Sequence, residues 1–245
     1  MIPQNPRELN YSKVKTYREC PYLYKLKYTE GRKEGLTPAT SLGVSIHRTL
    51  EDYHSHRGDP SEIMRYYNAN FLCAGFRSAA EQMEYYLKGR RMLEVYEQRE
   101  YGRKSTVDAT EREFMFDYEG WVIRGKIDRI DKLEDGGWEV IDYKTDAQLE
   151  ESYDITSSLQ LGIYSIGARR AWNLKKGKAT VYFVALDRKI SADFDSFNEK
   201  EILDIFTAAG EAIKAKKFDP DTKHCPRCLM NNRCPYSVVK QQEAA

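Results

Sequence analysis

The chain has 245 residues, of which 41% are apolar and 31% are charged, and its formal net charge is +1. This balance is typical of a globular protein with a core of its own, and it provides no overall attraction to nucleic acid or to a membrane surface. No apolar run reaches the roughly 18–20 residues of a membrane helix, and the N-terminus lacks the apolar core of a signal peptide. We therefore expect a cytoplasmic protein with no membrane partner.

The first hundred residues are predicted to be helical. Candidate helices cover residues 12–20, 21–28, 38–58, 60–77 and 81–101. Ser12 can cap the first of these helices, and Pro21 suits the first turn of the second. Cys73 falls in a helical, apolar stretch and is expected to be a buried core thiol.

The pattern changes after residue 101, where apolar and polar residues begin to alternate. Strands are predicted at residues 111–118, 121–130, 138–145 and 178–186, and helices at residues 157–172 and 198–216. The result is an α/β protein with a helical N-terminal half, followed by a small mixed sheet with helices packed against it.

The hairpin formed by the second and third predicted strands carries charges where apolar residues would be ordinary. Side chains alternate faces along a strand, so Asp142 and Lys144 share one face. A three-residue loop, Glu134–Gly136, would place Asp128 opposite Asp142, whereas a two- or four-residue loop would place it on the other face. The Gly-Gly pair at 136–137 fits a loop that needs a residue at positive φ.

Two facing carboxylates repel each other unless a positive group lies between them. A hard divalent cation such as Mg²⁺ or Mn²⁺ suits these oxygen ligands, and it could activate water for attack on a phosphate, with Lys144 assisting. The alternative is a surface hairpin whose charges only face water. His47, in a predicted helix, could add an imidazole ligand, and Gln160 and Tyr164 share one face of a later helix; each of these could equally be an ordinary helix residue.

Taken together, these residues resemble a known family. The ordered set is Gly43-x-x-x-His47, Gly125-Lys-Ile-Asp128-Arg-Ile-Asp, Ile141-Asp142-Tyr-Lys144-Thr and Gln160-x-x-x-Tyr164. It resembles the RecB-type branch of the PD-(D/E)xK nucleases over residues 43 to 164. The resemblance implies a restriction-endonuclease-like fold: a mixed central sheet flanked by helices.

The same resemblance assigns roles to individual residues. It implies that His47, Asp128, Asp142 and the backbone carbonyl of Tyr143 bind the catalytic Mg²⁺ or Mn²⁺, and that Asp128, Asp142 and Lys144 form the catalytic set. Gln160 and Tyr164 would lie near the DNA. Glu113 corresponds loosely to a further acidic position.

Four of the five cysteines form a second pattern, Cys225-x-x-Cys228-x₅-Cys234 near the C-terminus and Cys20 near the N-terminus. Four thiolates can hold Zn²⁺ or a [4Fe–4S] cluster, and the spacing alone does not choose. One cysteine before the nuclease motifs and three after them resembles the iron–sulfur nucleases of the AddB and CRISPR-associated types. That resemblance favours a [4Fe–4S] cluster, with Zn²⁺ as the runner-up.

We therefore expect a single nuclease domain over residues 1–245, with an iron–sulfur region formed by residues 11–30 and 217–237 and a helical insertion at residues 58–105. The expected activity is Mg²⁺- or Mn²⁺-dependent hydrolysis of DNA, single-stranded or at free ends, more as an exonuclease than an endonuclease. The resemblance implies a setting in DNA repair or recombination, phage DNA processing or CRISPR adaptation, in a prokaryotic or phage-infected cell.

Partners would then be DNA and, by resemblance, a helicase or CRISPR adaptation proteins; the sequence has no G-x-x-x-x-G-K-[ST] motif of its own. Two alternatives stay open: a non-catalytic DNA-binding or scaffold subunit of a helicase–nuclease complex, and a nuclease stabilised by zinc.

Overall fold

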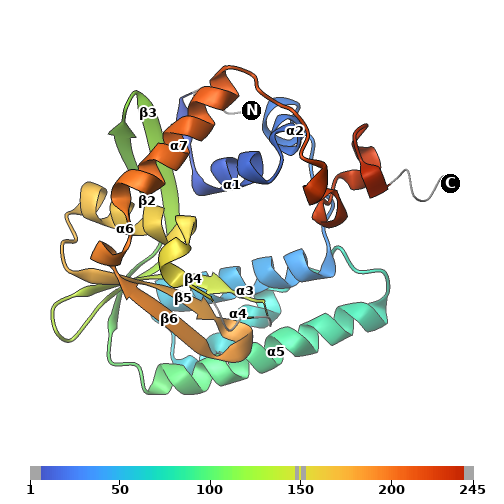
Figure 1. Cartoon of the computed structure of the whole chain (residues 1–245). Coiled ribbons are helices and arrows are strands. Elements are labelled where there is room, and N and C mark those ends of the chain that lie inside the picture. Colours follow the sequence, from blue (N-terminus) through green and yellow to red (C-terminus); the bar gives the residue numbers. More distant parts are fainter. Residues whose placement is uncertain (1–6, 147–148, 150–152, 240–245) are drawn as a thin grey trace. The chain divides into compact units, whose positions relative to one another are not determined.

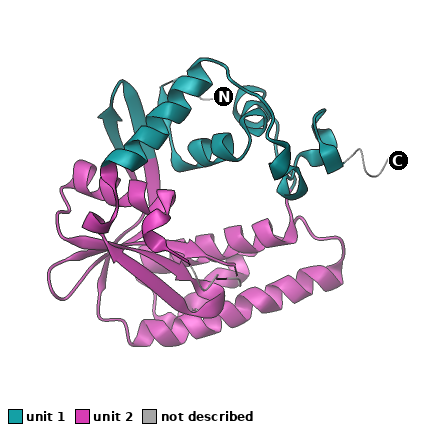
Figure 2. Cartoon of the chain, viewed as in Figure 1, with its two compact units in different colours: residues 1–35, 115–124, 200–245 teal, residues 36–114, 125–199 magenta. Residues whose placement is uncertain are grey.

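The computed structural model describes residues 7–146, 149 and 153–239, and the chain divides into two compact units. Unit 1 comprises residues 1–35, 115–124 and 200–245, and unit 2 comprises residues 36–114 and 125–199 (Figure 2). The outermost parts of the predicted single domain, residues 1–6 and 240–245, lie outside the described residues. Within the described part, none of the helices combines the length and the apolar character that a membrane crossing requires.

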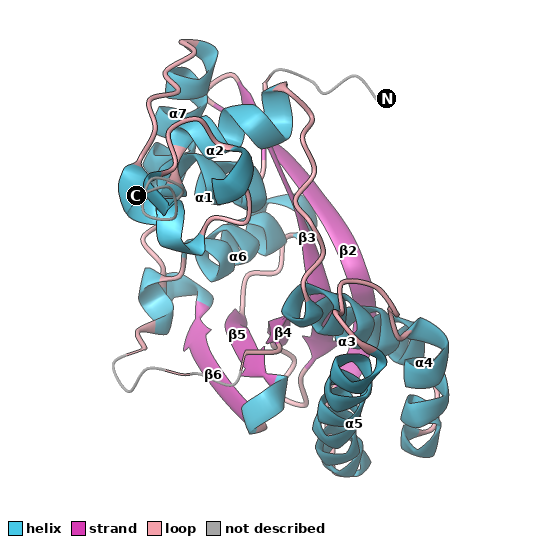
Figure 3. Cartoon of the chain, turned by 90° about the vertical axis from the view of Figure 1, so that its right-hand side faces the viewer, coloured by secondary structure: helices cyan, strands magenta, loops and turns pink. Residues whose placement is uncertain are grey.

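In unit 2, strands β4, β5 and β6 form a mixed sheet with β3 (Trp121–Lys132). Strand β4 (Trp138–Lys144) pairs antiparallel with β3 and parallel with β5 (Gly177–Phe183), and β6 (Arg188–Asp193) pairs antiparallel with β5 (Figures 1 and 3). The helices of this unit are α3 (Pro38–Ser55), α4 (Ile63–Asn70), α5 (Ala79–Tyr101) and α6 (Leu159–Trp172). The predicted α/β class is confirmed.

Unit 1 holds both ends of the described chain. Its elements are β1 (Glu8–Leu9), α1 (Tyr11–Glu19), α2 (Pro21–Tyr24), a π-helical turn at Lys25–Thr29, and all but the first residue of α7 (Glu199–Lys214). Strand β1 pairs parallel with the first residues of β3. Strand β2 (Thr106–Tyr118) pairs with β3, and both strands contain residues of the two units.

The helix between α3 and α5 is shorter than the sequence predicted. A helix over residues 60–77 was expected, but a 3₁₀ turn at Pro60–Glu62 leads into α4, which ends at Asn70. Phe71 is extended, and Gly75 adopts φ 87°, so the following segment is not helical. The prediction that Cys73 is a buried helical thiol is therefore wrong, because Cys73 is exposed in this segment.

The β3–β4 hairpin has the register that the predicted three-residue loop would set. Arg129 pairs with Ile141 and Lys132 with Trp138, and the Leu133 amide donates to the Gly137 carbonyl at 2.9 Å. Gly136 has φ 78°, the left-handed conformation that favours glycine in such a turn. Asp128 and Asp142 therefore lie on the same face of the sheet, and Arg129 and Tyr143 lie on the other.

The face that carries Arg129 and Tyr143 packs against helices α3, α4 and α5. Its apolar core includes Ile46 and Leu50 of α3, Leu93 of α5, and Ile141 and Tyr143 of β4. These side chains are almost fully removed from water, which is the main favourable term in folding.

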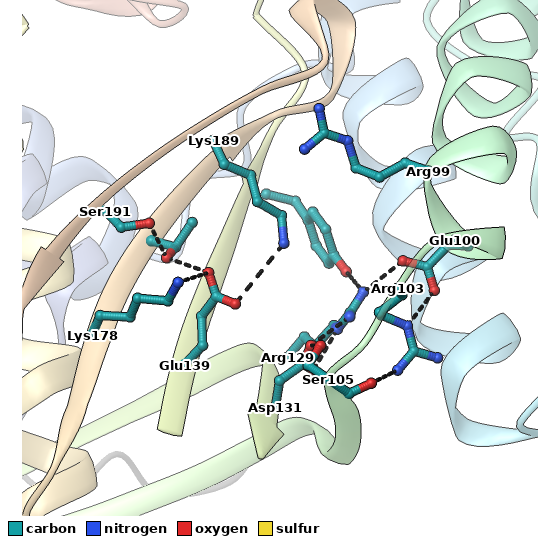
Figure 4. Close-up of polar contacts among 12 residues, drawn as sticks. Arg99, Glu100, Arg103, Ser105, Arg129, Asp131, Glu139, Lys178, Lys189 and Ser191 are labelled. Atoms are coloured by element: carbon teal, nitrogen blue, oxygen red, sulfur yellow. Dashed lines mark hydrogen bonds and ion pairs between the residues drawn. The ribbon is translucent and has the colours of Figure 1, made fainter. Parts of the chain in front are cut away.

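A charged group is buried in this apolar core. Arg129 is 1% exposed; its Nε and Nη2 each donate to Asp131 at 2.6 Å, and its Nη1 lies 3.2 Å from Glu100 Oε1 (Figure 4). The same Nη1 approaches Tyr96, His54 and Tyr143 at 2.8, 3.0 and 3.3 Å. We call these six residues, His54, Tyr96, Glu100, Arg129, Asp131 and Tyr143, the Arg129 network. Its second carboxylate is balanced by Arg103, whose Nε donates to Glu100 at 2.8 Å.

Replacing Arg129 with methionine should destabilise the fold strongly. The substitution leaves two buried carboxylates without their main cation, and breaking such a buried pair from one side costs about 3–5 kcal/mol. Urea unfolding of Arg129→Met and wild type measures the difference. The control is Lys200→Met, which removes one partner of the exposed Lys200–Asp204 pair and should change stability by about 0–1 kcal/mol. Equal midpoints for the two variants would contradict this role for Arg129.

Candidate active site

The predicted site residues of the hairpin lie where β3 and β4 separate. The backbone ladder between the two strands ends at the pair Arg129–Ile141. The next contact between the strands is made by a side chain. Asp128 Oδ2 accepts a hydrogen bond from the Tyr143 amide at 2.9 Å. We call this point the strand fork; here a carboxylate takes the place of a backbone carbonyl and is fixed by the neighbouring strand.

A chain of hydrogen bonds on the same face connects β4 to α6. Lys144 Nζ contacts Asp142 Oδ2 at 2.7 Å and donates to Gln160 Oε1 at 2.8 Å. Gln160 Nε2 in turn donates to Asp142 Oδ1 at 2.6 Å and to the Tyr164 hydroxyl at 3.0 Å. Asp142 is 2% exposed, and these donors hold both of its oxygens in fixed directions.

Gln160 and Tyr164 face this site from α6. Gln160 contacts both Asp142 and Lys144, whereas Tyr164, only 7% exposed, accepts a hydrogen bond from Gln160. The helix presents them correctly because residues four apart lie on one face. In this arrangement Gln160 orients the carboxylate and the lysine, and Tyr164 orients Gln160. The contact of both residues with DNA stays a prediction.

A tight approach of α6 to the sheet makes this connection possible. The ring of Phe114, on β2, lies against the backbone of Gly125 on β3 and of Gly167 on α6; a Cβ atom would come within 2.3 and 2.5 Å of the ring at these two positions. Only glycine leaves room for the ring at both. The Phe114 ring also meets Tyr164 edge-on, with centroids 6.1 Å apart.

A group of possible metal ligands lies beside the strand fork. One ligand atom each from His47, Glu111 and Asp128 lies within 4.8 Å of the other two. His47 Nδ1 is 3.5 Å from Asp128 Oδ2. Two carboxylates and one imidazole form a donor set that suits Mg²⁺ or Mn²⁺. The residues therefore fit the metal that the sequence motifs imply.

The electrostatics at the fork favour a cation. Burial raises the pKa of Asp128 well above its usual value, and the nearby charge of Asp142 raises it further. Burial lowers the pKa of His47, although Asp142 opposes this effect. A neutral imidazole beside crowded carboxylates is the state in which these groups bind a metal ion, and the ion would relieve the repulsion between the carboxylates.

Glu111 is a site residue that the sequence did not predict. The sequence analysis named Glu113 on the same strand, but Glu113 is exposed and is not part of the group, whereas Glu111 forms an ion pair with Lys126 and lies beside His47. Glu111 has φ 48°, so the strand departs from regular geometry at this residue. A regular alternation treats residues 111 and 113 alike, and no signal in the sequence marks the irregular one.

The four cysteines that were predicted to bind a cofactor lie together in unit 1. Cys20, Cys225, Cys228 and Cys234 line one cavity of about 20 Å³, and Cys20 packs with Leu23, Leu26 and Met230. The Asp221 amide donates to Cys20 Sγ at 3.4 Å. The cavity brings together segments some two hundred residues apart in the sequence.

Replacing Glu111 with glutamine should weaken binding of Mn²⁺ roughly 10–100-fold, the loss typical of removing even an outer-shell partner of a metal. Isothermal titration of the metal-free protein with Mn²⁺ measures the affinity. Glu113→Gln is the matched control: it makes the same chemical change two residues along β2 and should bind Mn²⁺ like the wild type. If the two variants bind equally well, Glu111 is not a ligand.

Comparisons with known proteins are consistent with this geometry. The sequence model of the PD-(D/E)XK nuclease superfamily matches residues 8–235. No curated protein matches the chain. Among solved structures, it is similar to a protein of Eubacterium rectale described as a "Putative exonuclease", with 15% identity, a TM-score of 0.57, and coverage of 89% of this chain and 85% of that chain. The structure of SSO0001 matches with 18% identity, a TM-score of 0.40, and coverage of 89% and 95%.

The family match covers nearly all of the described chain, and the expected restriction-endonuclease-like α/β fold is confirmed with it. The chain belongs to the PD-(D/E)XK nuclease superfamily.

Proposed function

We propose that this protein is a Mg²⁺- or Mn²⁺-dependent nuclease of the RecB-type branch that hydrolyses DNA, with His47, Asp128, Asp142, Lys144 and the Tyr143 carbonyl as its site. The observation that carries the proposal is the strand fork. There, buried carboxylates from two strands lie beside an imidazole and a lysine, all from the residues of the four motifs. Glu111 joins the proposed ligands because its carboxylate lies beside His47 and Asp128.

Each residue has a defined task in such a reaction. The metal ion would supply positive charge to the scissile phosphate and lower the pKa of the attacking water. Asp128 and Asp142 hold their oxygens in place through the Tyr143 amide and Gln160 respectively. Lys144, fixed between Asp142 and Gln160, keeps an ammonium group at the site, where it stabilises the negative charge that develops during hydrolysis.

An exonuclease acting on single strands or ends is the mode we favour. The solved structure from Eubacterium rectale carries the description "Putative exonuclease", which supports this choice by analogy. A role beside a helicase or in CRISPR adaptation rests on the sequence resemblance and stays a prediction.

We also propose that Cys20, Cys225, Cys228 and Cys234 bind a [4Fe–4S] cluster with a structural role. The four residues line one cavity. Among the described His, Cys, Asp and Glu residues, the one group of three or more ligand atoms within 4.8 Å of each other is that of His47, so no three of the sulfurs approach so closely. Zinc–sulfur bonds of about 2.3 Å in a tetrahedron would need sulfurs about 3.8 Å apart, which favours the larger cluster.

Zinc is the second candidate, and the size of the cavity favours it. A volume of about 20 Å³ suits a single small ion rather than a cluster. Metal analysis decides between the two.

The nuclease assay uses anaerobically purified full-length protein with end-labelled single-stranded DNA, double-stranded DNA, and closed circles that lack ends. Cleavage should need Mg²⁺ or Mn²⁺ and should spare the circles. Asp142→Ala and Lys144→Ala should each lose at least about 10²–10³-fold in rate, as expected when a preorganised electrostatic group is removed.

Lys200→Ala and Asp204→Ala are the matched controls. They remove the same two charges from an exposed ion pair on α7 and should retain full activity. Equal activity of the wild type and both site variants would refute the site. A wild type that binds DNA but never cleaves it would support the non-catalytic subunit.

The cofactor prediction is tested by iron, sulfide and zinc analysis together with the visible spectrum. Wild type should be coloured and contain iron and sulfide, whereas Cys228→Ala should be colourless and less stable, because the cofactor joins distant segments of the chain. Cys73→Ala is the control, since that thiol is exposed in unit 2. Stoichiometric zinc without iron would identify the zinc site instead.

A further inference from the structure

The Arg129 network lies on the opposite face of β3 and β4 from the strand fork, and each strand connects the two directly. On β3, the network residue Arg129 follows Asp128 of the fork. On β4, one residue serves both faces: the Tyr143 amide donates to Asp128, while its hydroxyl lies 2.9 Å from the Tyr96 hydroxyl and 3.3 Å from Arg129 Nη1. The two faces are therefore one residue apart along each strand.

The helix that supplies the imidazole is connected in the same way. His47 and His54 are seven residues apart on α3, and two helical turns place them on the same side of the helix. His54 Nε2 lies 2.7 Å from the Tyr96 hydroxyl and 3.0 Å from Arg129 Nη1. Burial and the charge of Arg129 lower the pKa of His54 well below its usual value, so the ring is neutral and accepts from the guanidinium.

We propose that Arg129 is a positioning residue of the nuclease site, and that it acts through the hydroxyls of Tyr143 and Tyr96. One guanidinium connects β3, β4 and α3, the three elements that carry Asp128, the Tyr143 backbone and His47. These bonds thereby fix the orientation of α3 relative to the strand fork. The role in catalysis rests on the proposed function; the role in fixing the fork does not.

Two features separate this arrangement from ordinary packing. The charges of the network are balanced once its neighbour Arg103 is included, since Arg129 and Arg103 face Asp131 and Glu100 (Figure 4). The guanidinium binds Asp131 through two parallel hydrogen bonds, which fixes its plane as well as its position. Two parallel hydrogen bonds restrict the orientation of the guanidinium, whereas apolar contacts alone are non-directional.

The test removes single hydroxyl groups and keeps the rings, so that the core is retained. Tyr143→Phe cuts the connection from the network to β4. Tyr182→Phe is the matched control: Tyr182 pairs with Tyr143 in the β4–β5 ladder and is 1% exposed, but its hydroxyl donates to Asp187 at 2.7 Å, away from Arg129. Both variants lose one buried hydroxyl from the same core.

Amide hydrogen exchange, measured by NMR on the metal-free protein, reports how often the strand fork opens. This measurement does not require nuclease activity. In Tyr143→Phe the amide of residue 143, which donates to Asp128, should exchange about tenfold faster relative to those of Val140 and Ile141, as expected for a local opening. Affinity for Mn²⁺ should fall about tenfold, and kcat for DNA should fall while KM stays the same. Tyr182→Phe should leave all of these unchanged.

The outcomes separate this inference from the proposed function. A wild type without nuclease activity would refute the function, while the exchange rates would still decide the role of Arg129. Equal exchange at residue 143 and equal Mn²⁺ affinity in wild type and Tyr143→Phe would overturn the inference. Equal effects of Tyr143→Phe and Tyr182→Phe would also overturn it, because the hydroxyl would then act only through general packing.

Discussion

Holding two carboxylates close together is the constraint on which this structure depends. Asp128 and Asp142 lie on one face of two adjacent strands, where burial and the nearby charge of Asp142 raise the pKa of Asp128. The protein meets this cost with directed donors: the Tyr143 amide binds Asp128, and Gln160 and Lys144 bind Asp142. These donors hold the carboxylates in the positions from which, as we propose, they would bind a divalent cation.

The opposite face of the same strands carries a second buried charge with a different solution. Arg129 is surrounded by carboxylates and hydroxyls within the chain, so its charge is balanced by side chains alone. One face of the sheet is thus electrostatically complete, and the other favours an ion. Tyr143 belongs to both, through its side chain on one face and its backbone on the other. This division gives the sheet one side on which the buried charge is paired and one side on which we propose the active site.

Much of the site could be predicted because it depends on local geometry. The alternation of strand residues put Asp142 and Lys144 on one face. A three-residue loop was one of the loop lengths that the sequence left open, and the structure has the register that sets Asp128 on that face as well. Residues four apart on a helix placed Gln160 and Tyr164 together. Strand β6 was missed, because its six residues, Arg188–Asp193, are mostly polar and lack a clear apolar pattern.

The amino-acid sequence by itself determined the α/β class and the motif residues, and it limited the hairpin to a few registers, since these features follow from periodicity and turn chemistry over short distances. Only the tertiary structure decided that Glu111 rather than Glu113 approaches His47, and that Cys73 is exposed. It alone brought Arg129 together with His54 and Tyr96, whereas the family resemblance had already grouped Cys20 with three cysteines near the other end of the chain. These contacts join residues tens to hundreds of positions apart, and no local rule of spacing encodes which distant side chains meet.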